Sequence, residues 1–258
     1  MSSQCTFENS PLEATGKPSP DELAILKPLE ADLPPGVLTD DAVMAPTSGE
    51  RQLDRGNARR AAALLDEAGW TTGTDGMRRN AAGQTLRVEF LDFNQSYDRI
   101  VNPYVENLRA IGVDAVLSRV DPSELTTRTR SHDFDIVRDS LGNGYGIGGG
   151  TAQAFGSEHS DDVFNPMGLA NPAIDRLIEI GSAATTDAEN RVAIRALDRA
   201  LRSLRFWVPK WFKAEYTLAY YDMYRHPEQM PPYALGTLDF WWADTAREAE
   251  LKAAGAIR

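Results

Sequence analysis

The sequence predicts an α/β fold in which a mixed sheet is flanked by helices. Apolar and charged residues alternate from Leu86 to Phe90, which is typical of a strand with one buried face, and Val113–Val120 predicts a second strand. Apolar residues recur at helical spacing before, between and after these strands. Strands and helices that alternate with short connections indicate a parallel layer with right-handed crossovers.

The first 55 residues are rich in proline and acidic residues and predict an extended arm that lies against other structure. Ser19-Pro20-Asp21-Glu22 has a cap, a proline at the first helical position and a glutamate three residues after the cap, so a short helix should run to about Lys27. Pro34-Pro35-Gly36 then breaks the chain, and an extended connection is expected up to Arg55.

The region after this arm predicts three helices and three strands. A first helix, ended by Gly69, precedes the first strand, and a second helix, ended by Gly112, follows it. Asp121-Pro122-Ser123-Glu124 opens a third helix, and Phe134–Val137 predicts a short third strand. The apolar stripes of the first two helices are Ala61, Leu64, Leu65 and Ala68, and then Ile100, Tyr104, Leu108 and Ile111.

A long glycine-rich loop is expected from Asp139 to Met167, and a loop of this length in a compact domain is usually functional or disordered. Two helices follow, one around residues 174–178 and one over residues 194–204. The tail from Phe206 to Trp242 holds 12 of the chain's 22 aromatic residues, and Trp207–Tyr224 predicts one or two strands. We therefore divide the chain into an arm (1–55), a main lobe (56–213) and an aromatic-rich C-terminal segment (214–258).

Composition argues against several classes of partner. Lys and Arg number 27 against 38 Asp and Glu, and the formal net charge of −11 repels phosphate backbones, so no nucleic acid is expected to bind. No stretch approaches the roughly 20 apolar residues of a membrane span, so no membrane insertion by this chain is expected. The single cysteine, Cys5, leaves the compartment open, and Met1–Cys5 lacks the basic and apolar regions of a signal peptide.

No motif in the sequence predicts catalysis, a cofactor or a metal. Gly144–Gly149 matches the dinucleotide pattern G-x-G-x-x-G, but residues 150–155 predict a polar loop instead of the helix that holds the pyrophosphate. His132, His159 and His226 are far apart and lack metal-ligand spacing. Neither a G-x-S-x-G elbow nor a Walker lysine is present. We expect a protein that is not an enzyme and that uses no cofactor.

Polar and aromatic side chains follow the first and third predicted strands. Ligands of open α/β sheets bind beyond the carboxyl ends of the strands, where these side chains should meet. Ordinary turn and capping chemistry explains the same residues equally well. The candidate ligand-binding residues are Asn94, Gln95, Arg138, Asp139, Asn143 and Tyr145.

Several segments, in order along the chain, match one protein family. They are Ala61–Trp70, Phe134–Arg138, Asn171–Ile178, Trp207–Phe212 and Pro231–Trp242, with counterparts of Phe7–Pro20 and Leu33-Pro34-Pro35 in the arm. Through them the chain resembles the C-terminal part of extracellular solute-binding protein family 5, the substrate-binding proteins of peptide-type ABC importers. The branch that handles oligopeptides and peptide-like antibiotics of the microcin C type is the most similar.

The resemblance implies a periplasmic-binding-protein type II-like lobe of a two-lobed receptor with the N-terminal lobe missing. Such a receptor closes on a peptide or peptide-like ligand without cofactor or chemistry and delivers it to ABC importer permease subunits. Residues 56–213 would be the C-terminal ligand-binding lobe, and residues 214–258 would return toward the absent lobe. The complete protein would be periplasmic. Two alternatives stay open, namely an orphan fragment that binds nothing and an α/β enzyme without a recognisable motif.

One position departs from the family pattern. Arg138 matches the family's arginine, after which the better-known oligopeptide receptors carry a tryptophan and then an aspartate that pairs with the peptide's free amine. Leu141 and Gly144 stand at those two positions here. Asp139 is the candidate substitute for the aspartate, and a blocked, longer or modified peptide fits as well as a short peptide with a free N-terminus.

Overall fold

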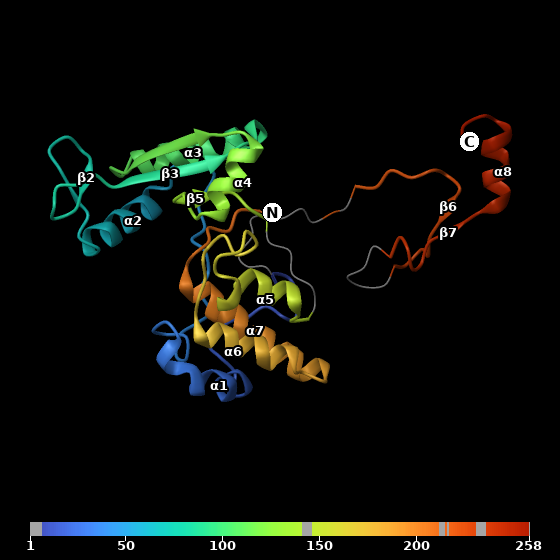
Figure 1. The fold of residues 1–258 in the computed structure, drawn as a ribbon, viewed down its shortest axis with the longest axis horizontal. Helices are drawn as coiled ribbons and strands as arrows, with labels where there is room; N and C mark the ends of the chain where they lie inside the picture. Colours follow the sequence, from blue (N-terminus) through green and yellow to red (C-terminus); the bar gives the residue numbers. More distant parts are fainter. Residues whose placement is uncertain (1–6, 141–145, 212–214, 216, 231–235, 258) are drawn as a thin grey trace. The chain divides into compact units, whose positions relative to one another are not determined.

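The computed structural model describes residues 7–140, 146–211, 215, 217–230 and 236–257 (Figure 1). The chain forms two compact units, residues 2–211 and residues 212–258, which are described separately below. The first unit combines a parallel sheet with helices, which confirms the predicted α/β class. None of the helices in the described part of the chain is long and apolar enough to cross a bilayer.

The central sheet of the first unit contains three parallel strands in the order β4-β3-β5. The three strands predicted for the main lobe are present, and the antiparallel pairs of the described chain lie in separate two-stranded sheets. Phe90 in the middle strand is in register with Leu117 on one side and Ile136 on the other. The strands are β3 (Arg87–Asp92), β4 (Asp114–Arg119) and β5 (Ile136–Val137).

Helices α3 (Asp98–Arg109) and α4 (Pro122–Arg130) follow β3 and β4 and contact opposite faces of the sheet. Val101 and Val105 of α3 pack with Phe90 on one face, whereas Arg128 of α4 binds Glu89 at 2.6 Å from the other. Leu108 and Ile111 of the predicted stripe pack against this core, but the stripe missed Val101 and Val105, which are the buried residues of α3. Which residues of α3 are buried depends on where the helix crosses the sheet.

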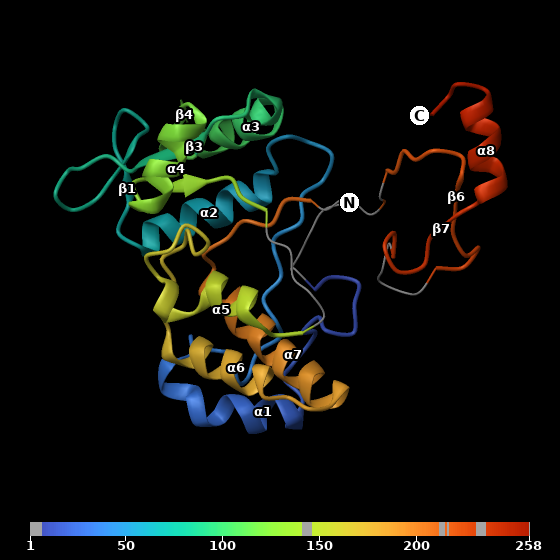
Figure 2. The ribbon, with the colours of Figure 1, turned by 45° about the vertical axis from the view of Figure 1, so that its right-hand side comes forward.

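The second apolar core of this unit lies among helices. α1 (Pro20–Leu26), α6 (Pro172–Ser182) and α7 (Asp187–Leu204) lie side by side (Figures 1 and 2), and all three were predicted. The predicted long loop contains two short helices, α5 (Gly149–Phe155) and η3 (Ser157–His159), so the expectation of a polar loop over residues 150–155 was wrong. Burial of Phe155 against Phe206 and Trp207 stabilises α5, whose sequence carries little helical pattern.

Helix α2 (Arg55–Glu67) ends where Gly69 adopts a φ of +85°, as predicted. Its predicted apolar stripe is mostly exposed, and Leu64 is 64% accessible. Leu65 alone among the stripe residues reaches the core beside the sheet. A small antiparallel pair, β1 (Thr71–Thr72) with β2 (Arg78–Arg79), follows the helix. The turn η1 (Lys27–Asp32) continues α1, and η2 (Gln95–Tyr97) precedes α3.

The second unit pairs β6 (Tyr224–Arg225) with β7 (Trp242–Ala243) and ends in α8 (Thr245–Ala253). The prediction of one or two strands over Trp207–Tyr224 was wrong for the described residues, of which only Tyr224 belongs to a named strand. Arg247 of α8 bonds Asp222 at 2.7 Å and ties the helix to the strand pair.

Polar contacts fasten the N-terminal arm to α7. Three arginines of α7, spaced four and three residues apart, donate to arm carbonyls: Arg195 to Pro11 at 2.8 Å, Arg199 to Gly16 at 2.9 Å, and Arg202 to Val43 at 3.0 Å. Residues at this spacing share one face of a helix. The arm therefore lies along a polar face of α7, while the apolar face packs in the core.

Glu22 and Arg199 form a buried ion pair in this contact, with 4% and 1% of their surfaces accessible. The Arg199 guanidinium lies 3.3 Å from Oε1 of Glu22, whereas Oε2 accepts the N–H of Ser19 at 2.9 Å and completes the capping box of α1. One carboxylate thus caps α1 and joins it to α7. Because both charges are out of water, each depends on the other for compensation.

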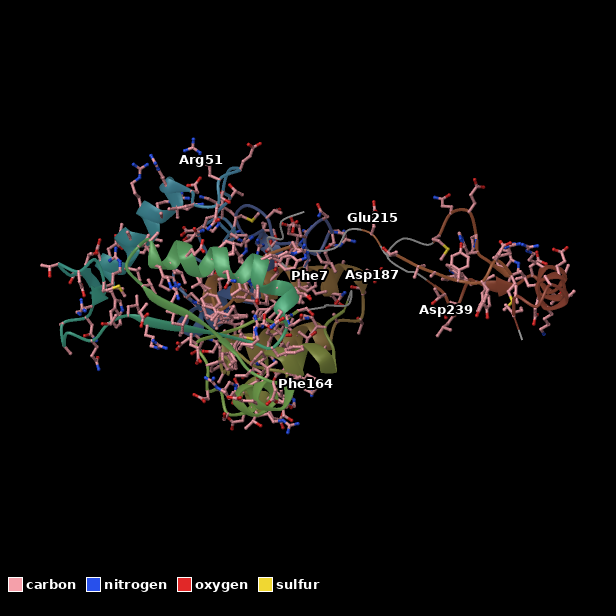
Figure 3. All side chains as sticks on the ribbon, turned by 90° about the horizontal axis from the view of Figure 1, so that it is seen from above. Phe7, Arg51, Phe164, Asp187, Glu215 and Asp239 are labelled. Carbon is pink, nitrogen blue, oxygen red and sulfur yellow. The ribbon has the colours of Figure 1, made fainter. Side chains whose placement is uncertain are left out.

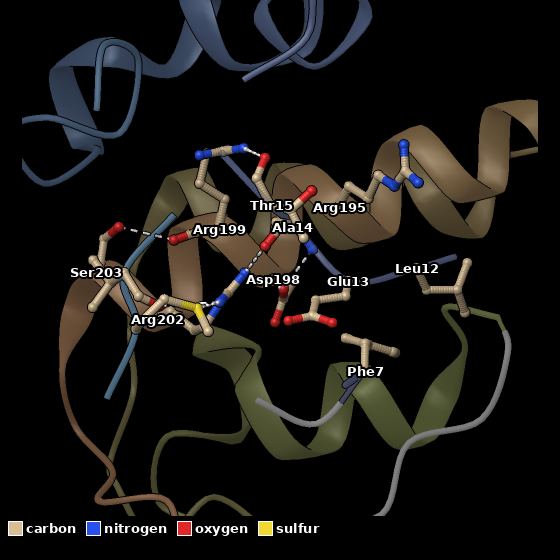
Figure 4. Close-up of polar contacts among 12 residues, drawn as sticks. Phe7, Leu12, Glu13, Ala14, Thr15, Arg195, Asp198, Arg199, Arg202 and Ser203 are labelled. Atoms are coloured by element: carbon tan, nitrogen blue, oxygen red, sulfur yellow. Dashed lines mark hydrogen bonds and ion pairs between the residues drawn. The ribbon is translucent and has the colours of Figure 1, made fainter. Parts of the chain in front are cut away.

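Asp198 is the second buried carboxylate on this face of α7. Its Oδ2 accepts the N–H of Ala14 at 3.0 Å and bonds Arg202 at 2.8 Å, while its Oδ1 is buried without a hydrogen-bond partner in the described chain (Figure 4). Burial raises the pKa of Asp198 to about 6, although Arg202 opposes the change. The ionised form is therefore less favourable in the folded chain than in the unfolded one.

Replacing Arg199 by Met should leave Glu22 as an uncompensated buried charge. We expect the free energy of unfolding, measured in urea, to fall by about 3–5 kcal/mol. The matched control is Arg176→Met, which removes an exposed pair with Glu179 and should cost less than about 1 kcal/mol. Equal effects of the two substitutions would contradict the role of the buried pair.

Asp198 should make stability depend on pH between about 4 and 6. Its pKa is higher in the folded chain than its ordinary value of 3.8, so its contribution is complete below that value and is lost as the pH rises through about 6. Relative to Asp198→Asn, the wild-type free energy of unfolding should fall by up to about 3 kcal/mol over this interval. Parallel stability curves for the two proteins would show that Asp198 does not titrate there.

Candidate ligand-binding site

The carboxyl ends of β3 and β5 meet at the topological switch point of the sheet. The chain runs from β3 to β4 on one side and then returns across β3 to β5 on the other. Ligands of open α/β sheets bind in the crevice beyond such a point. Asp92, the last residue of β3, and Arg138, directly after β5, lie here with Nε of Arg138 3.1 Å from Oδ2 of Asp92.

Asp92 holds the groups around it in place. It is 3% accessible, its Oδ1 accepts the N–H of Asn94 at 2.9 Å, and Nη1 of Arg119, at the end of β4, is 3.7 Å away. Burial acts to raise the pKa of Asp92, but the Asn94 hydrogen bond and Arg138 outweigh it and leave the pKa below its usual value. Asp92 is therefore an ionised anchor for two arginines from neighbouring strands.

Arg138 also stacks on aromatic side chains. Its guanidinium carbon lies 3.9 Å from the centroid of the Tyr97 ring and 6.0 Å from that of Phe93. The Tyr97 ring in turn stacks with Trp211, with centroids 6.1 Å apart and 29° between the planes. A guanidinium over an aromatic face is attracted to it electrostatically. The strand ends therefore carry a platform of flat groups with a fixed charge.

Four of the six sequence-predicted site residues lie in the described chain. Asn94 is half-buried and caps η2, its side chain accepting the N–H of Ser96 at 3.0 Å. Gln95 is exposed on η2, close in sequence to Tyr97. Arg138 and Asp139 lie together after β5, and Asp139 is exposed and accepts the N–H of Ser140 at 2.7 Å. The other two predicted residues, Asn143 and Tyr145, are outside the described residues.

A surface hollow of about 500 Å³ opens on the α4 side of Arg138 and Asp139. Thr126 and Thr129 of α4 line one wall, and Gln153 of α5 contributes to another. The exposed ring of Phe164, labelled in Figure 3, also lines this hollow. Polar groups and a flat apolar ring at the edge of a hollow suit a ligand with both polar and apolar parts.

Three residues of the site were not among the predicted ones. Arg119 ends β4, so the same strand-end rule that selected Arg138 could have selected it. Tyr97 and Trp211 carry no such signal, because they are more than 100 positions apart in the sequence and meet only through the fold.

The site is equipped to bind and to orient a ligand. Its side chains offer charges, hydrogen bonds and aromatic faces. No group of three or more potential metal ligands occurs among the residues that the structure describes.

A family model, "Bacterial extracellular solute-binding proteins, family 5 Middle", matches residues 27–161, just over half of the chain. The protein named "Probable peptide-binding protein YejA" of Agrobacterium fabrum is 36% identical over 242 residues, which are 93% of this chain and 39% of that protein. The protein named "Uncharacterized protein YejA" of Escherichia coli is 32% identical over 249 residues, 96% of this chain and 41% of that protein. The chain thus spans about two fifths of the length of these relatives.

Solved structures share the fold. The oligopeptide-binding protein AppA from Bacillus subtilis, in complex with a nonapeptide, superposes with a TM-score of 0.53 and 16% sequence identity. The match covers 92% of this chain and 48% of that one. This likeness supports the predicted periplasmic-binding-protein type II-like lobe.

Replacing Asp92 by Asn should release Arg138 and Arg119 from their shared anchor. At neutral pH we expect the free energy of unfolding to fall by about 2 kcal/mol, the usual value of a charge-assisted hydrogen bond. Since the folded pKa of Asp92 lies below 3.8, the difference between the two proteins should persist above that value and shrink as the pH falls through the folded pKa.

Asp114→Asn is the matched control for this measurement. It removes an exposed pair with Arg87, joined at 2.9 Å at the opposite end of the strands, and should cost less than about 1 kcal/mol. A loss for Asp92→Asn no larger than that of the control would show that Asp92 does not anchor the site.

Proposed function

The chain belongs to family 5 of the bacterial extracellular solute-binding proteins, and we propose that it is the substrate-binding component, as a partial chain, of an ABC importer for oligopeptides or peptide-like solutes. The ligand is held non-covalently, without cofactor and without turnover. The observation that carries the proposal is the charged and aromatic platform of Asp92, Arg138 and Tyr97 at the switch point of the sheet. The peptide-binding name of the Agrobacterium relative supports the ligand class.

In this proposal residues 56–213 are the ligand-binding lobe, residues 1–55 are its arm, and residues 214–258 return toward a second lobe. The chain spans 39% of the Agrobacterium relative, so a second lobe has room in a protein of that length. The ligand then lies in the cleft between the lobes. The complete protein acts in the periplasm and delivers its ligand to permease subunits.

The ligand-binding residues of the proposal are those at the strand ends. Arg138 and the neighbouring rings face a peptide's main chain and side chains, and Asn94, Gln95, Asn143 and Tyr145 remain candidates for further contacts. Asp139 takes the role of the amine-binding carboxylate. Its side chain is exposed beside Arg138 and, among the residues that the structure describes, accepts only the N–H of the adjacent Ser140, so it can accept from a ligand ammonium.

A synthetic tetrapeptide, Ala-Phe-Ala-Ala, tests both the function and the role of Asp139. By calorimetry, the 258-residue chain should bind it, and Asp139→Ala should weaken binding about tenfold, since about 1.4 kcal/mol is a factor of ten. The N-acetylated peptide, which lacks the ammonium, should bind both proteins alike. Asp161→Ala removes an exposed carboxylate elsewhere in the lobe and should behave as the wild type.

The outcomes separate the two claims. Failure of the wild-type chain to retain any member of a mixed tri- to octapeptide pool, analysed by native mass spectrometry, would contradict peptide binding. Unchanged affinity of Asp139→Ala for the free-amine peptide would contradict only the role of Asp139.

A further inference from the structure

The segment after α7 brings a lysine to the edge of the candidate site. Trp211 stacks on Tyr97 with centroids 6.1 Å apart, and Lys210 directly precedes it. The Tyr97 ring itself carries the Arg138 guanidinium at 3.9 Å. Lys210 is exposed, so a ligand lying on these rings can reach its ammonium group.

Among the described residues, the charges at this edge are paired, apart from those of Asp139 and Lys210. Asp92 pairs with Arg138, and Asp98 pairs with Arg119, which also lies 3.7 Å from Asp92. Both carboxylates are thus occupied by guanidinium groups. Within residues 7–140 and 146–211, Lys210 forms no ion pair, although the chain as a whole carries a net charge of −11.

The surroundings of Lys210 disfavour its charge. Although the Lys210 side chain as a whole is exposed, protein atoms around its ammonium group shield that group in part from water. This shielding and the nearby positive charge of Arg138 lower the pKa of Lys210, and Asp92 offsets only part of the effect. An anion placed beside the ammonium group would favour its charged form and raise the pKa of Lys210 again. The geometry therefore leaves a place for one negative charge next to an aromatic surface.

We infer that Lys210 is a specificity-determining residue that binds a carboxylate of the ligand, with Trp211 and Tyr97 covering the apolar group next to that carboxylate. The inference rests on the proposed function and narrows its ligand class to peptides with an accessible carboxylate. A singly charged carboxylate matches one ammonium, because Arg138 and Arg119 are already paired with Asp92 and Asp98. An exposed lysine offers a point charge on a mobile stem and tolerates ligands of different length.

The tetrapeptide Ala-Phe-Ala-Ala and its C-terminal amide differ only in the carboxylate and test the inference. The wild-type chain should bind the free acid about tenfold more tightly than the amide. Lys210→Met retains the length of the side chain without its charge and should abolish this preference. Lys210→Arg keeps the charge and should keep the preference, as should the control Lys17→Met at an exposed lysine of the arm.

A preference that is lost in Lys210→Met and kept in the other two variants supports the inference. Equal binding of acid and amide by the wild type, or an unchanged preference in Lys210→Met, would overturn it while peptide binding, and with it the proposed function, stands. The thermal unfolding midpoint of each variant, measured beforehand, ensures that folded proteins are compared.

A second probe pair decides the inference if the chain binds neither tetrapeptide. Benzoate and benzamide share a ring and differ in charge. After ¹³C-dimethylation of the lysines, the NMR signal of Lys210 is assigned by its absence from Lys210→Arg. This signal should shift when benzoate is added, and the pKa of Lys210 should rise. Benzamide should cause neither change. The same response to both compounds, or none to benzoate, would overturn the carboxylate site.

Discussion

Glu22 carries out two tasks that usually fall to two residues, and the helical half of the first unit depends on them. One oxygen caps α1, and the other compensates Arg199 of α7, so the arm helix and the core helix share one buried charge pair. A buried pair contributes little net stability compared with apolar packing, but removing one partner leaves a costly charge. Together with the three arginines that donate to arm carbonyls, this pair determines where the N-terminal arm lies.

The same use of arginine organises the ligand-binding edge. Asp92 is as buried as Glu22, and it orients Arg138 and Arg119 from two different strands. Arg138 in turn lies on Tyr97, which contacts Trp211 from the segment after α7. Planar guanidinium groups suit such sites because they pair with carboxylates and stack on rings at the same time. An acidic chain thus builds its structure and its site from a few arginines held by buried carboxylates.

The proposed peptide site follows from this arrangement. The paired charges give a rigid platform, while Asp139 and Lys210, of opposite sign, have no ion-pair partner in the described lobe and are exposed. A peptide carries an ammonium at one end and a carboxylate at the other, so the two side chains complement its two ends. Side chains that are already held in ion pairs need little reorganisation when a ligand binds, and the unpaired charges remain available to it. Such a site is suited to binding by lobe closure.

Local signals in the sequence determined much of this protein. The capping box at Ser19, the proline starts of α1, α4 and α6, and the glycine after α2 lie within a few residues of the structure they produce, so the helices could be predicted. The strand-end rule likewise selected Arg138.

Only the tertiary structure decided that α5 is a helix packed on Phe206 and Trp207, that Val101 and Val105 face the core, and that Leu64 stays exposed. It also brought Trp211 to Tyr97 and Arg199 to Glu22, since such contacts depend on how distant elements pack, which no spacing within one segment encodes.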